Sequence, residues 1–139
     1  MAISENYYDS GRHSSFYLSS GPEDGPLIIF VHGWPELSFS WRNQLEFFGD
    51  RGWHAVAPDM RGYGRSSFYK KHEDYAQSEI AIDMVEFFEH FDRDSAVWVG
   101  HDWGSPVVWN MALHEPDKVR ALASLCVPLG FERGVEELV

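Results

Sequence analysis

The sequence predicts an α/β fold with a mostly parallel sheet flanked by helices. Two short segments, residues 27–31 and 96–99, are continuous apolar runs rich in β-branched residues. Such runs are typical of strands that are buried on both faces, as in a parallel sheet. Segments with the spacing of amphipathic helices lie between and after these runs. The alternation of strands and helices indicates an α/β architecture.

The first half of the chain contains a predicted hairpin, a helix and two strands. Residues 6–20 alternate loosely in polarity and precede a polar turn region, which indicates two short paired strands. After the strand at 27–31, apolar residues recur with helical spacing over residues 41–48 and predict an amphipathic helix. Residues 54–57 form a short strand, and residues 59–73, rich in glycine, serine and charge, are a loop.

The second half repeats the alternation around the strand at 96–99. Apolar residues with helical spacing predict a helix over about residues 75–91. Residues 103–115 are a further predicted helix, with Pro106 in the first turn, where the missing N–H costs little. Residues 119–127 are the last predicted strand. The tail, residues 130–139, is either the entry to a cap or a segment of another kind, and its pattern does not decide between them.

Composition restricts the class of partner and compartment. The length of 139 residues predicts one domain. The net charge of -11 argues against nucleic acid or an anionic membrane as partner. The longest apolar run is residues 27–31, far too short to span a bilayer. The N-terminus is polar and acidic, unlike a signal peptide. Cys126 has no second cysteine to pair with, so we expect a reducing, cytoplasmic compartment. We also expect Cys126, on an apolar strand, to be a small residue of the core.

The first chemical motif is Gly-His-Asp-Trp-Gly at residues 100–104, where a buried strand turns directly into a helix. The spacing glycine-x-nucleophile-x-glycine is that of a nucleophile elbow. The sharp turn strains the central residue, and Gly100 and Gly104 give structural support by removing collisions beside it. The motif predicts that Asp102 is an ionised nucleophile above the carboxyl end of the sheet. The alternative is that Asp102 caps the helix.

The second motif, His-Gly-Trp-Pro at residues 32–35, follows the first buried strand. An elbow enzyme builds its oxyanion hole from two backbone N–H groups, which we assign to Trp34 and Trp103. The rings of these two residues, with Pro35, either line an apolar pocket for substrate or pack in the core. His32 and Gly33 are predicted to support the loop structurally.

The third motif lies at residues 58–66, after the strand at 54–57, and its glycines permit a tight loop at the same edge of the sheet. We expect Asp59 and Arg61 to form an ion pair that fixes this loop. Glu36 is expected to favour the first turn of the helix that follows it. His101 is expected to orient a loop rather than to act as an acid or base.

The three motifs, in this order and each after a predicted strand, resemble the α/β-hydrolase superfamily in its branch of epoxide hydrolases and haloalkane dehalogenases. The resemblance covers about residues 5–128 and implies that residues 1–139 are the N-terminal part of a core domain. It implies that Asp102 opens a small apolar epoxide through a covalent ester, which water then hydrolyses. The resemblance implies no metal and no cofactor.

Within that branch the residues favour epoxide opening. Trp34 stands where many haloalkane dehalogenases have Asn, and Trp103 stands where fluoroacetate-type dehalogenases have Arg. No acid follows the last predicted strand, where some dehalogenases place one. Half of a haloalkane dehalogenase is the alternative.

The resemblance also implies groups that this sequence does not supply. The superfamily places an acid and a histidine after the nucleophile, and epoxide hydrolases add a helical cap with two tyrosines. His114, twelve residues after Asp102, would lie about 18 Å away along a helix, too far to act as a base. We therefore expect no turnover by the 139-residue chain alone. The alternative is a truncated, non-catalytic binding or dimerising module that self-associates through its exposed strand at 119–127.

Overall fold

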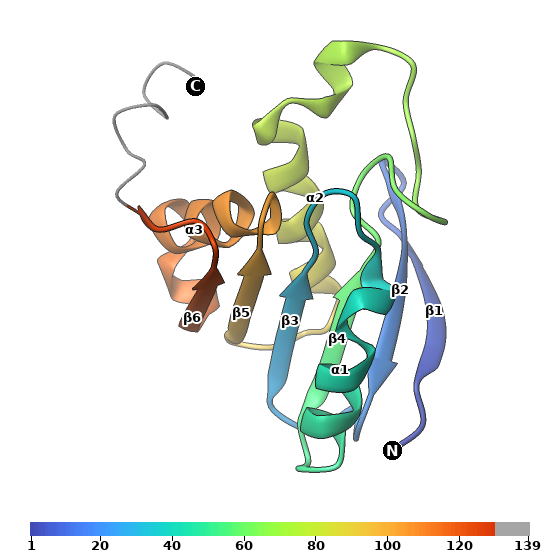
Figure 1. Cartoon of the computed structure of the whole chain (residues 1–139), viewed down its shortest axis with the longest axis vertical. Coiled ribbons are helices and arrows are strands. Elements are labelled where there is room, and N and C mark those ends of the chain that lie inside the picture. Colours follow the sequence, from blue (N-terminus) through green and yellow to red (C-terminus); the bar gives the residue numbers. More distant parts are fainter. Residues whose placement is uncertain (130–139) are drawn as a thin grey trace.

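The computed structural model describes residues 1–129, and they form one six-stranded sheet with helices on both faces (Figure 1). The strand order is β1-β2-β4-β3-β5-β6. The tail at 130–139 lies outside the described residues. The strands are β1 (Ser4–Asp9), β2 (Ser14–Ser20), β3 (Leu27–Val31), β4 (His54–Pro58), β5 (Ala96–His101) and β6 (Val119–Leu125). The helices are α1 (Arg42–Gly49), α2 (Gln77–His90) and α3 (Gly104–His114), with short 3-10 helices η1 (Ser38–Trp41), η2 (His72–Tyr75) and η3 (Pro116–Lys118).

The predicted α/β fold with a mostly parallel sheet is confirmed. Strand β3 pairs in parallel with β4 and with β5, and β5 pairs in parallel with β6. The predicted hairpin is also present, since β1 pairs antiparallel with β2, and β2 continues antiparallel onto β4. The helix predicted over 41–48 is divided, because the 3-10 helix η1 carries Trp41 and α1 starts at the next residue.

The central strand β3 explains how the core is divided between the two faces of the sheet. All five of its residues are buried. Leu27, Ile29 and Val31 pack with α2 and α3 in one apolar cluster. Ile28 and Phe30 point to the opposite face, where they pack with α1 in a second cluster. Because β3, β4 and β5 are parallel, their carboxyl ends meet at one edge, and the loops that follow them lie together there (Figure 1).

A buried ion pair fixes the loop after β4 to helix α2. Arg61 Nε lies 2.7 Å from Asp83 Oδ2, and Arg61 Nη2 lies 2.9 Å from Asp83 Oδ1. Both side chains are buried. Arg12, from the turn between β1 and β2, also donates to the Asp83 carboxylate. The planar guanidinium matches the two carboxylate oxygens, so this pair holds the loop, the hairpin and the helix in one arrangement.

The expected ion pair between Asp59 and Arg61 was wrong. Asp59 Oδ1 accepts a hydrogen bond from the Ser38 N–H at 2.9 Å, and Asp59 Oδ2 accepts one from the Arg65 N–H at 3.0 Å. The carboxylate therefore joins the loops after β3 and β4 through backbone amides. The sequence did not show this because amides of a separate loop approach Asp59 only in the folded chain.

Strand β6 lies at the edge of the sheet and pairs with β5 on one side, within the part of the chain that the structure describes. Cys126 follows it with a φ of 77° and is exposed, so its expected place in the core was wrong. The strand ends at Leu125, so Cys126 lies outside it, in the segment that follows. Self-association through this edge stays a prediction.

Among residues 1–129, no helix has the length and apolar character needed to span a bilayer.

The Asp83→Ala variant is expected to lose about 3–5 kcal/mol of stability, because Arg61 is left buried without its carboxylate. The matched variant Glu79→Ala removes a half-exposed carboxylate that lies 3.1 Å from Arg12 and only 3.9 Å from Arg61, leaves the buried Asp83 pair in place, and is expected to lose less than about 1 kcal/mol. Urea unfolding followed by circular dichroism measures both changes. Equal losses in the two variants would contradict the role assigned to the buried pair.

Candidate active site

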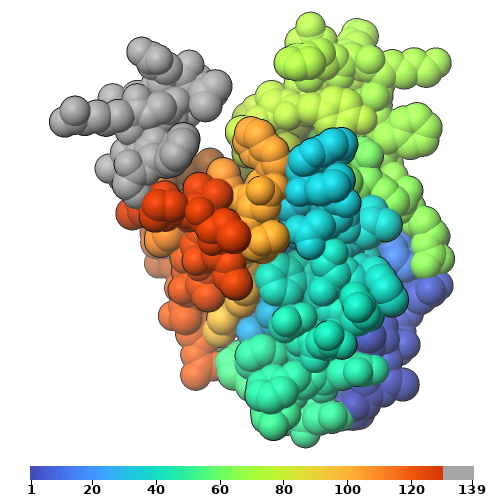
Figure 2. Space-filling model, viewed as in Figure 1, coloured from blue at the N-terminus to red at the C-terminus, as the bar shows by residue number. Residues whose placement is uncertain are grey.

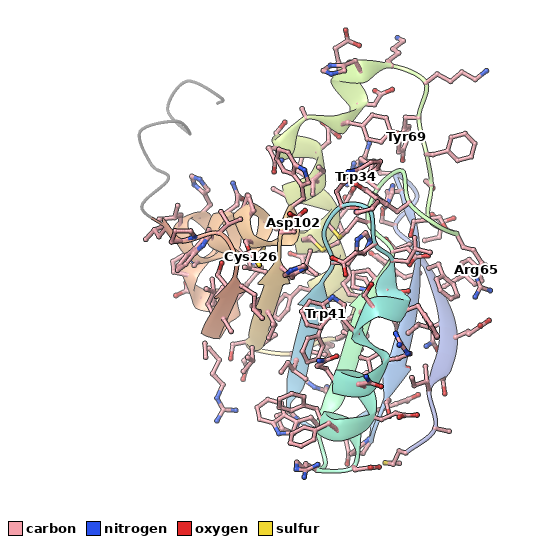
Figure 3. The ribbon with its side chains drawn as sticks, in the orientation of Figure 1. Trp34, Trp41, Arg65, Tyr69, Asp102 and Cys126 are labelled. Atoms are coloured by element: carbon pink, nitrogen blue, oxygen red, sulfur yellow. The ribbon has the colours of Figure 1, made fainter. Side chains whose placement is uncertain are left out.

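Asp102 lies at the turn between β5 and α3, at the carboxyl edge of the sheet (Figure 3). Its φ is 54°, in the left-handed region that residues other than glycine rarely adopt. The Ser105 N–H donates to the Asp102 carbonyl at 3.0 Å, which closes the turn. The Ser105 hydroxyl donates to the Leu125 carbonyl at 2.9 Å and attaches the turn to the end of β6. The cap position of α3 is Trp103, and no side chain caps this helix.

The glycines on either side of Asp102 are required by close backbone contacts. A Cβ atom on Gly100 would lie 2.5 Å from the Gly104 carbonyl oxygen. A Cβ atom on Gly104 would lie 2.2 Å from the Val31 carbonyl oxygen. Real Cβ contacts do not come this close to backbone atoms, so α3 starts in direct contact with β5 and β3 only because both residues are glycine.

The loop after β3 lies directly against Asp102. The Trp34 N–H donates to Asp102 Oδ2 at 2.9 Å. A Cβ atom on Gly33 would lie 2.4 Å from the Asp102 Cβ atom, so no other residue fits at position 33 without a shift. Figure 2 shows the same contact at the surface, where the segment after β3, in cyan, meets the segment after β5, in orange.

The surroundings of Asp102 favour its charged form. The hydrogen bond from the Trp34 N–H, and after it that from the Trp103 N–H, lower the pKa of the Asp102 carboxyl below its ordinary value. These are the two amides that the sequence assigns to an oxyanion hole. The structure therefore brings the predicted nucleophile and both predicted donors together, with Asp102 ionised at neutral pH.

His32 holds the loops after β3 and β4 together. Its Nε2 atom accepts a hydrogen bond from the Met60 N–H at 2.9 Å, and its Nδ1 atom lies 2.9 Å from the Gly33 carbonyl oxygen. Burial lowers the pKa of His32, so the ring is neutral and Nδ1 donates to Gly33. Both ring nitrogens are occupied, which gives His32 a structural role.

His101, the last residue of β5, pairs with Glu36 in the loop after β3. The distance from His101 Nδ1 to Glu36 Oε1 is 2.8 Å. Burial raises the pKa of Glu36, but the hydrogen bonds from His101 and Ser40 outweigh it and leave the pKa lowered. The expectation that Glu36 favours the first turn of the following helix was wrong, because η1 begins at Ser38 with no acidic residue in its first turn, and Glu36 pairs with His101 instead.

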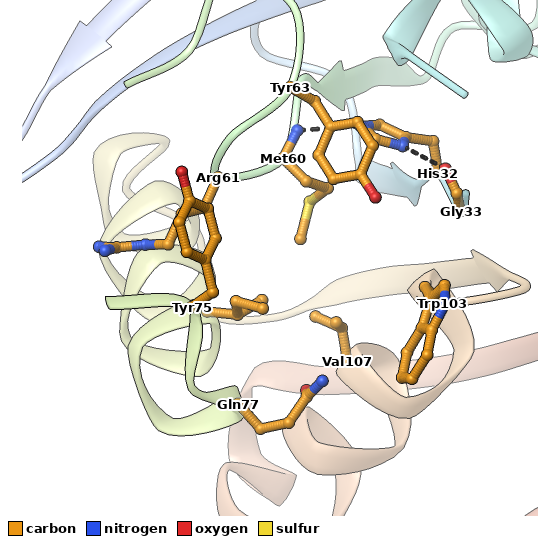
Figure 4. A pocket seen from close by; sticks show the side chains of 10 residues that line it. His32, Gly33, Met60, Arg61, Tyr63, Tyr75, Gln77, Trp103 and Val107 are labelled. Carbon is orange, nitrogen blue, oxygen red and sulfur yellow. Dashed lines mark hydrogen bonds between the residues drawn. The ribbon is translucent and has the colours of Figure 1, made fainter. Parts of the chain in front are cut away.

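A cavity of about 270 Å³ opens beside the elbow (Figure 4). Trp103 lines it, whereas Trp34 is 64% exposed and neither Trp34 nor Pro35 is among the lining residues. Tyr63, Tyr75 and Gln77 line it too, and no motif in the sequence selects them. They come from the long loop after β4 and the start of α2, and only the folded path of that loop brings them to the elbow. The full lining is His32, Gly33, Met60, Arg61, Tyr63, Tyr75, Gln77, Ile80, Trp103 and Val107.

Two other features concern possible chemistry near Asp102. His114 is the last residue of α3 and is exposed, at the end of the helix away from the elbow. Among residues 1–129, no group of three or more His, Cys, Asp or Glu side chains is placed to hold a metal ion.

Comparison with known proteins assigns this geometry to a family. The family model described as alpha/beta hydrolase fold matches residues 26–136. Epoxide hydrolase A of Mycobacterium tuberculosis is 44% identical over 127 residues, which cover 91% of this chain and 39% of that protein. Bifunctional epoxide hydrolase 2 of Sus scrofa is 45% identical over 104 residues, which cover 75% of this chain and 19% of that protein.

Solved structures agree with these relatives. An epoxide hydrolase from Vigna radiata superposes on this chain with a TM-score of 0.88 at 33% sequence identity. The match covers 91% of this chain and 41% of the Vigna radiata chain. Epoxide Hydrolase A from Mycobacterium thermoresistibile gives a TM-score of 0.87 at 38% identity, with 91% and 40% covered. The chain therefore spans about two fifths of these structures, and the resemblance to epoxide hydrolases is confirmed.

The strain at the elbow predicts an unusual order of stability for two variants. Asp102→Gly is expected to be more stable than Asp102→Ala, by about tenfold in the unfolding equilibrium constant, because only glycine adopts a positive φ without cost. Both variants lack the carboxylate, so their difference reports the backbone alone. Asn110, inside α3, is the matched control, and there alanine is expected to be the more stable residue. Urea unfolding tests the order, and the same order at both positions would contradict strain at Asp102.

The amide donors also predict the titration of Asp102. The carboxyl pKa is expected to lie below 3.8, its ordinary value, because the Trp34 and Trp103 amides stabilise the anion. A depressed carboxyl pKa means that the anion is present above that value and is lost only as the pH falls through the lowered pKa. Carbon NMR of the Asp side chains, with Asp102→Asn to assign the signal, measures the midpoint. A midpoint at or above 3.8 would show that the amides do not bind the carboxylate.

Proposed function

Because the chain belongs to the alpha/beta hydrolase family, we propose that it carries the nucleophile part of an epoxide-hydrolase-like site. Its substrate is a small apolar epoxide, and Asp102 is the attacking group. The observation that carries the proposal is the ionised Asp102 carboxylate, raised on a strained turn and bound by the Trp34 amide. The similar proteins named as epoxide hydrolases support the choice of substrate. Residues 1–139 then act as part of a core domain.

The first step is a displacement at a saturated carbon. The Trp34 N–H binds Oδ2, so the attack comes from Oδ1. A bond forms between Oδ1 and an epoxide carbon, the bond from that carbon to the epoxide oxygen breaks, and this oxygen, released as an alkoxide, takes a proton from water. Asp102 is suited to this step because it is ionised without a positively charged side chain bound to it.

The second step uses the same two amides in a different role. In the ester, Oδ2 becomes the carbonyl oxygen and keeps the Trp34 N–H as donor, with the Trp103 N–H as the second amide beside the Asp102 side chain. When water attacks the ester carbon, negative charge develops on this oxygen, and the two donors stabilise it. The amides that keep Asp102 ionised in the free protein thus become the oxyanion hole of the intermediate.

Hydrolysis of the ester also requires a base that activates water. Of the three histidines that lie in the motif segments or in α3, His32 has both nitrogens bonded, His101 is paired with Glu36, and His114 lies at the far end of the helix. The 139-residue chain by itself therefore forms the ester without turning it over efficiently.

The chain is expected to gain the mass of one substrate molecule when it is incubated with styrene oxide, and to produce no sustained diol. Intact-protein mass spectrometry measures the adduct, peptide mapping locates it on Asp102, and chromatography measures the diol. We expect the ester to form on Asp102 because its carboxylate is both ionised and accessible.

Asp102→Asn is the matched control, since it keeps the size of the side chain and removes the anionic oxygen. It is expected to show no adduct under the same conditions. A label on other carboxylates at the same rate as on Asp102, or an equal label in Asp102→Asn, would overturn the assignment of the nucleophile.

A further inference from the structure

The cavity beside the elbow is a slot with two largely apolar walls (Figure 4). Met60 and Tyr63, from the loop after β4, lie on one side of it. Trp103 and Val107, from the first turns of α3, lie on the other. Ile80 of α2 adds a further apolar side chain to the lining. The walls thus come from three separate elements that meet at the carboxyl edge of the sheet.

The charged side chain in the lining and two of its polar side chains are bonded within the protein, and its other polar groups are uncharged. Arg61 is held by the buried Asp83 carboxylate. The Tyr75 hydroxyl donates to the Tyr69 carbonyl at 3.0 Å and accepts from the Tyr69 N–H at 2.8 Å. Both nitrogens of His32 are bonded as described above. The lining therefore presents no uncompensated charge, which favours a neutral occupant.

The cavity adjoins Asp102 through two of its neighbours, although Asp102 itself is not one of the lining residues. Gly33 and Trp103 both line it, and Gly33 is in direct contact with Asp102. Tyr63 lies across the cavity with its ring packed edge-on against His32, with a centroid distance of 4.9 Å. Burial and then the negative charge of Asp102 raise the pKa of Tyr63, which agrees with its place near that carboxylate. A group attached to the carbon that Asp102 attacks can therefore extend into the cavity.

The size and the rings of the lining point to an aromatic group. A cavity of about 150 Å³ with apolar walls is enough to hold benzene. The 270 Å³ found here leaves room for a phenyl ring and a short linker. The rings of Tyr63 and Trp103 offer the edge and face contacts that aromatic groups prefer.

We propose that this cavity binds the neutral aromatic substituent of the epoxide that Asp102 opens, and we name it the aryl pocket. The proposal rests on the proposed function, and it adds the class of substrate: epoxides that carry an aryl group rather than small alkyl or charged epoxides. Selectivity arises in the walls from Met60, Ile80 and Val107, which are not among the hydrogen-bond donors to Asp102.

The test compares how fast the 139-residue chain is labelled at Asp102 by styrene oxide and by propylene oxide, measured as intact mass against time. The quantity of interest is the ratio of the two rates, which cancels differences in folded fraction. Ile80→Trp fills the aryl pocket from α2, and the ratio is expected to fall about tenfold. Ile82→Trp adds the same ring at an exposed position of the same helix and is expected to leave the ratio unchanged.

A second variant covers the case in which Ile80→Trp does not fold. Ile80→Ala enlarges the aryl pocket, and it is expected to raise the rate with 2-naphthyloxirane relative to styrene oxide. A change in either ratio of less than about twofold, with Asp102 still labelled, would overturn the aryl pocket and leave the proposed function standing.

A binding measurement separates the aryl pocket from the reaction. Asp102→Asn, which is unable to form the ester, is mixed with 1-phenyl-1,2-ethanediol, and amide shifts are followed by NMR. Shifts centred on Tyr63, Ile80 and Val107 support the aryl pocket even if no epoxide labels Asp102, in which case only the proposed function fails. The absence of shifts at these residues, with shifts elsewhere or none, would overturn the aryl pocket.

Discussion

The close contact between the strand β3 and the β5–α3 turn is the constraint on which the site depends. Gly104 lies against the Val31 carbonyl, and Gly33 lies against Asp102, at separations that leave no space for a Cβ atom. This contact forces Asp102 into a left-handed conformation and at the same time brings the Trp34 amide within hydrogen-bond distance of its carboxylate. The same packing contact therefore produces both the strained backbone of Asp102 and the stabilisation of its carboxylate charge.

Three aspartates at this edge of the sheet show how surroundings decide the role of the same side chain. Asp83 is buried and bound by Arg61 and Arg12, so its charge is neutralised and serves to hold elements together. Asp59 is buried with a backbone amide on each oxygen, and it joins two loops. Asp102 is also bound by backbone amides, but it stands at the surface of the turn and keeps an oxygen for reaction. Amide donors stabilise the anion without pairing it with a fixed cation, which keeps it nucleophilic.

The buried network around Arg61 links the fold to the cavity. The same loop that Arg61 attaches to α2 also carries Met60 and Tyr63, which form one wall of the cavity beside Asp102. Because the Asp83 carboxylate compensates the charge of Arg61, the lining has no unpaired charge even though Arg61 is part of it. Stability of the loop and the apolar character of the cavity therefore have a common origin.

The sequence by itself determined the elements, their parallel arrangement, and the positions of Asp102, Trp34 and Trp103, because apolar runs and glycine spacing are local properties of the chain. It misplaced the partners of Asp59 and Arg61, assigned Glu36 to a helix turn instead of a contact with β5, and put the exposed Cys126 in the core. Those partners lie on other elements, so they depend on how loops meet across the sheet edge. The tertiary structure alone decided that Tyr63 and α2 complete a cavity next to Asp102, since a cavity exists only where separate segments pack around it.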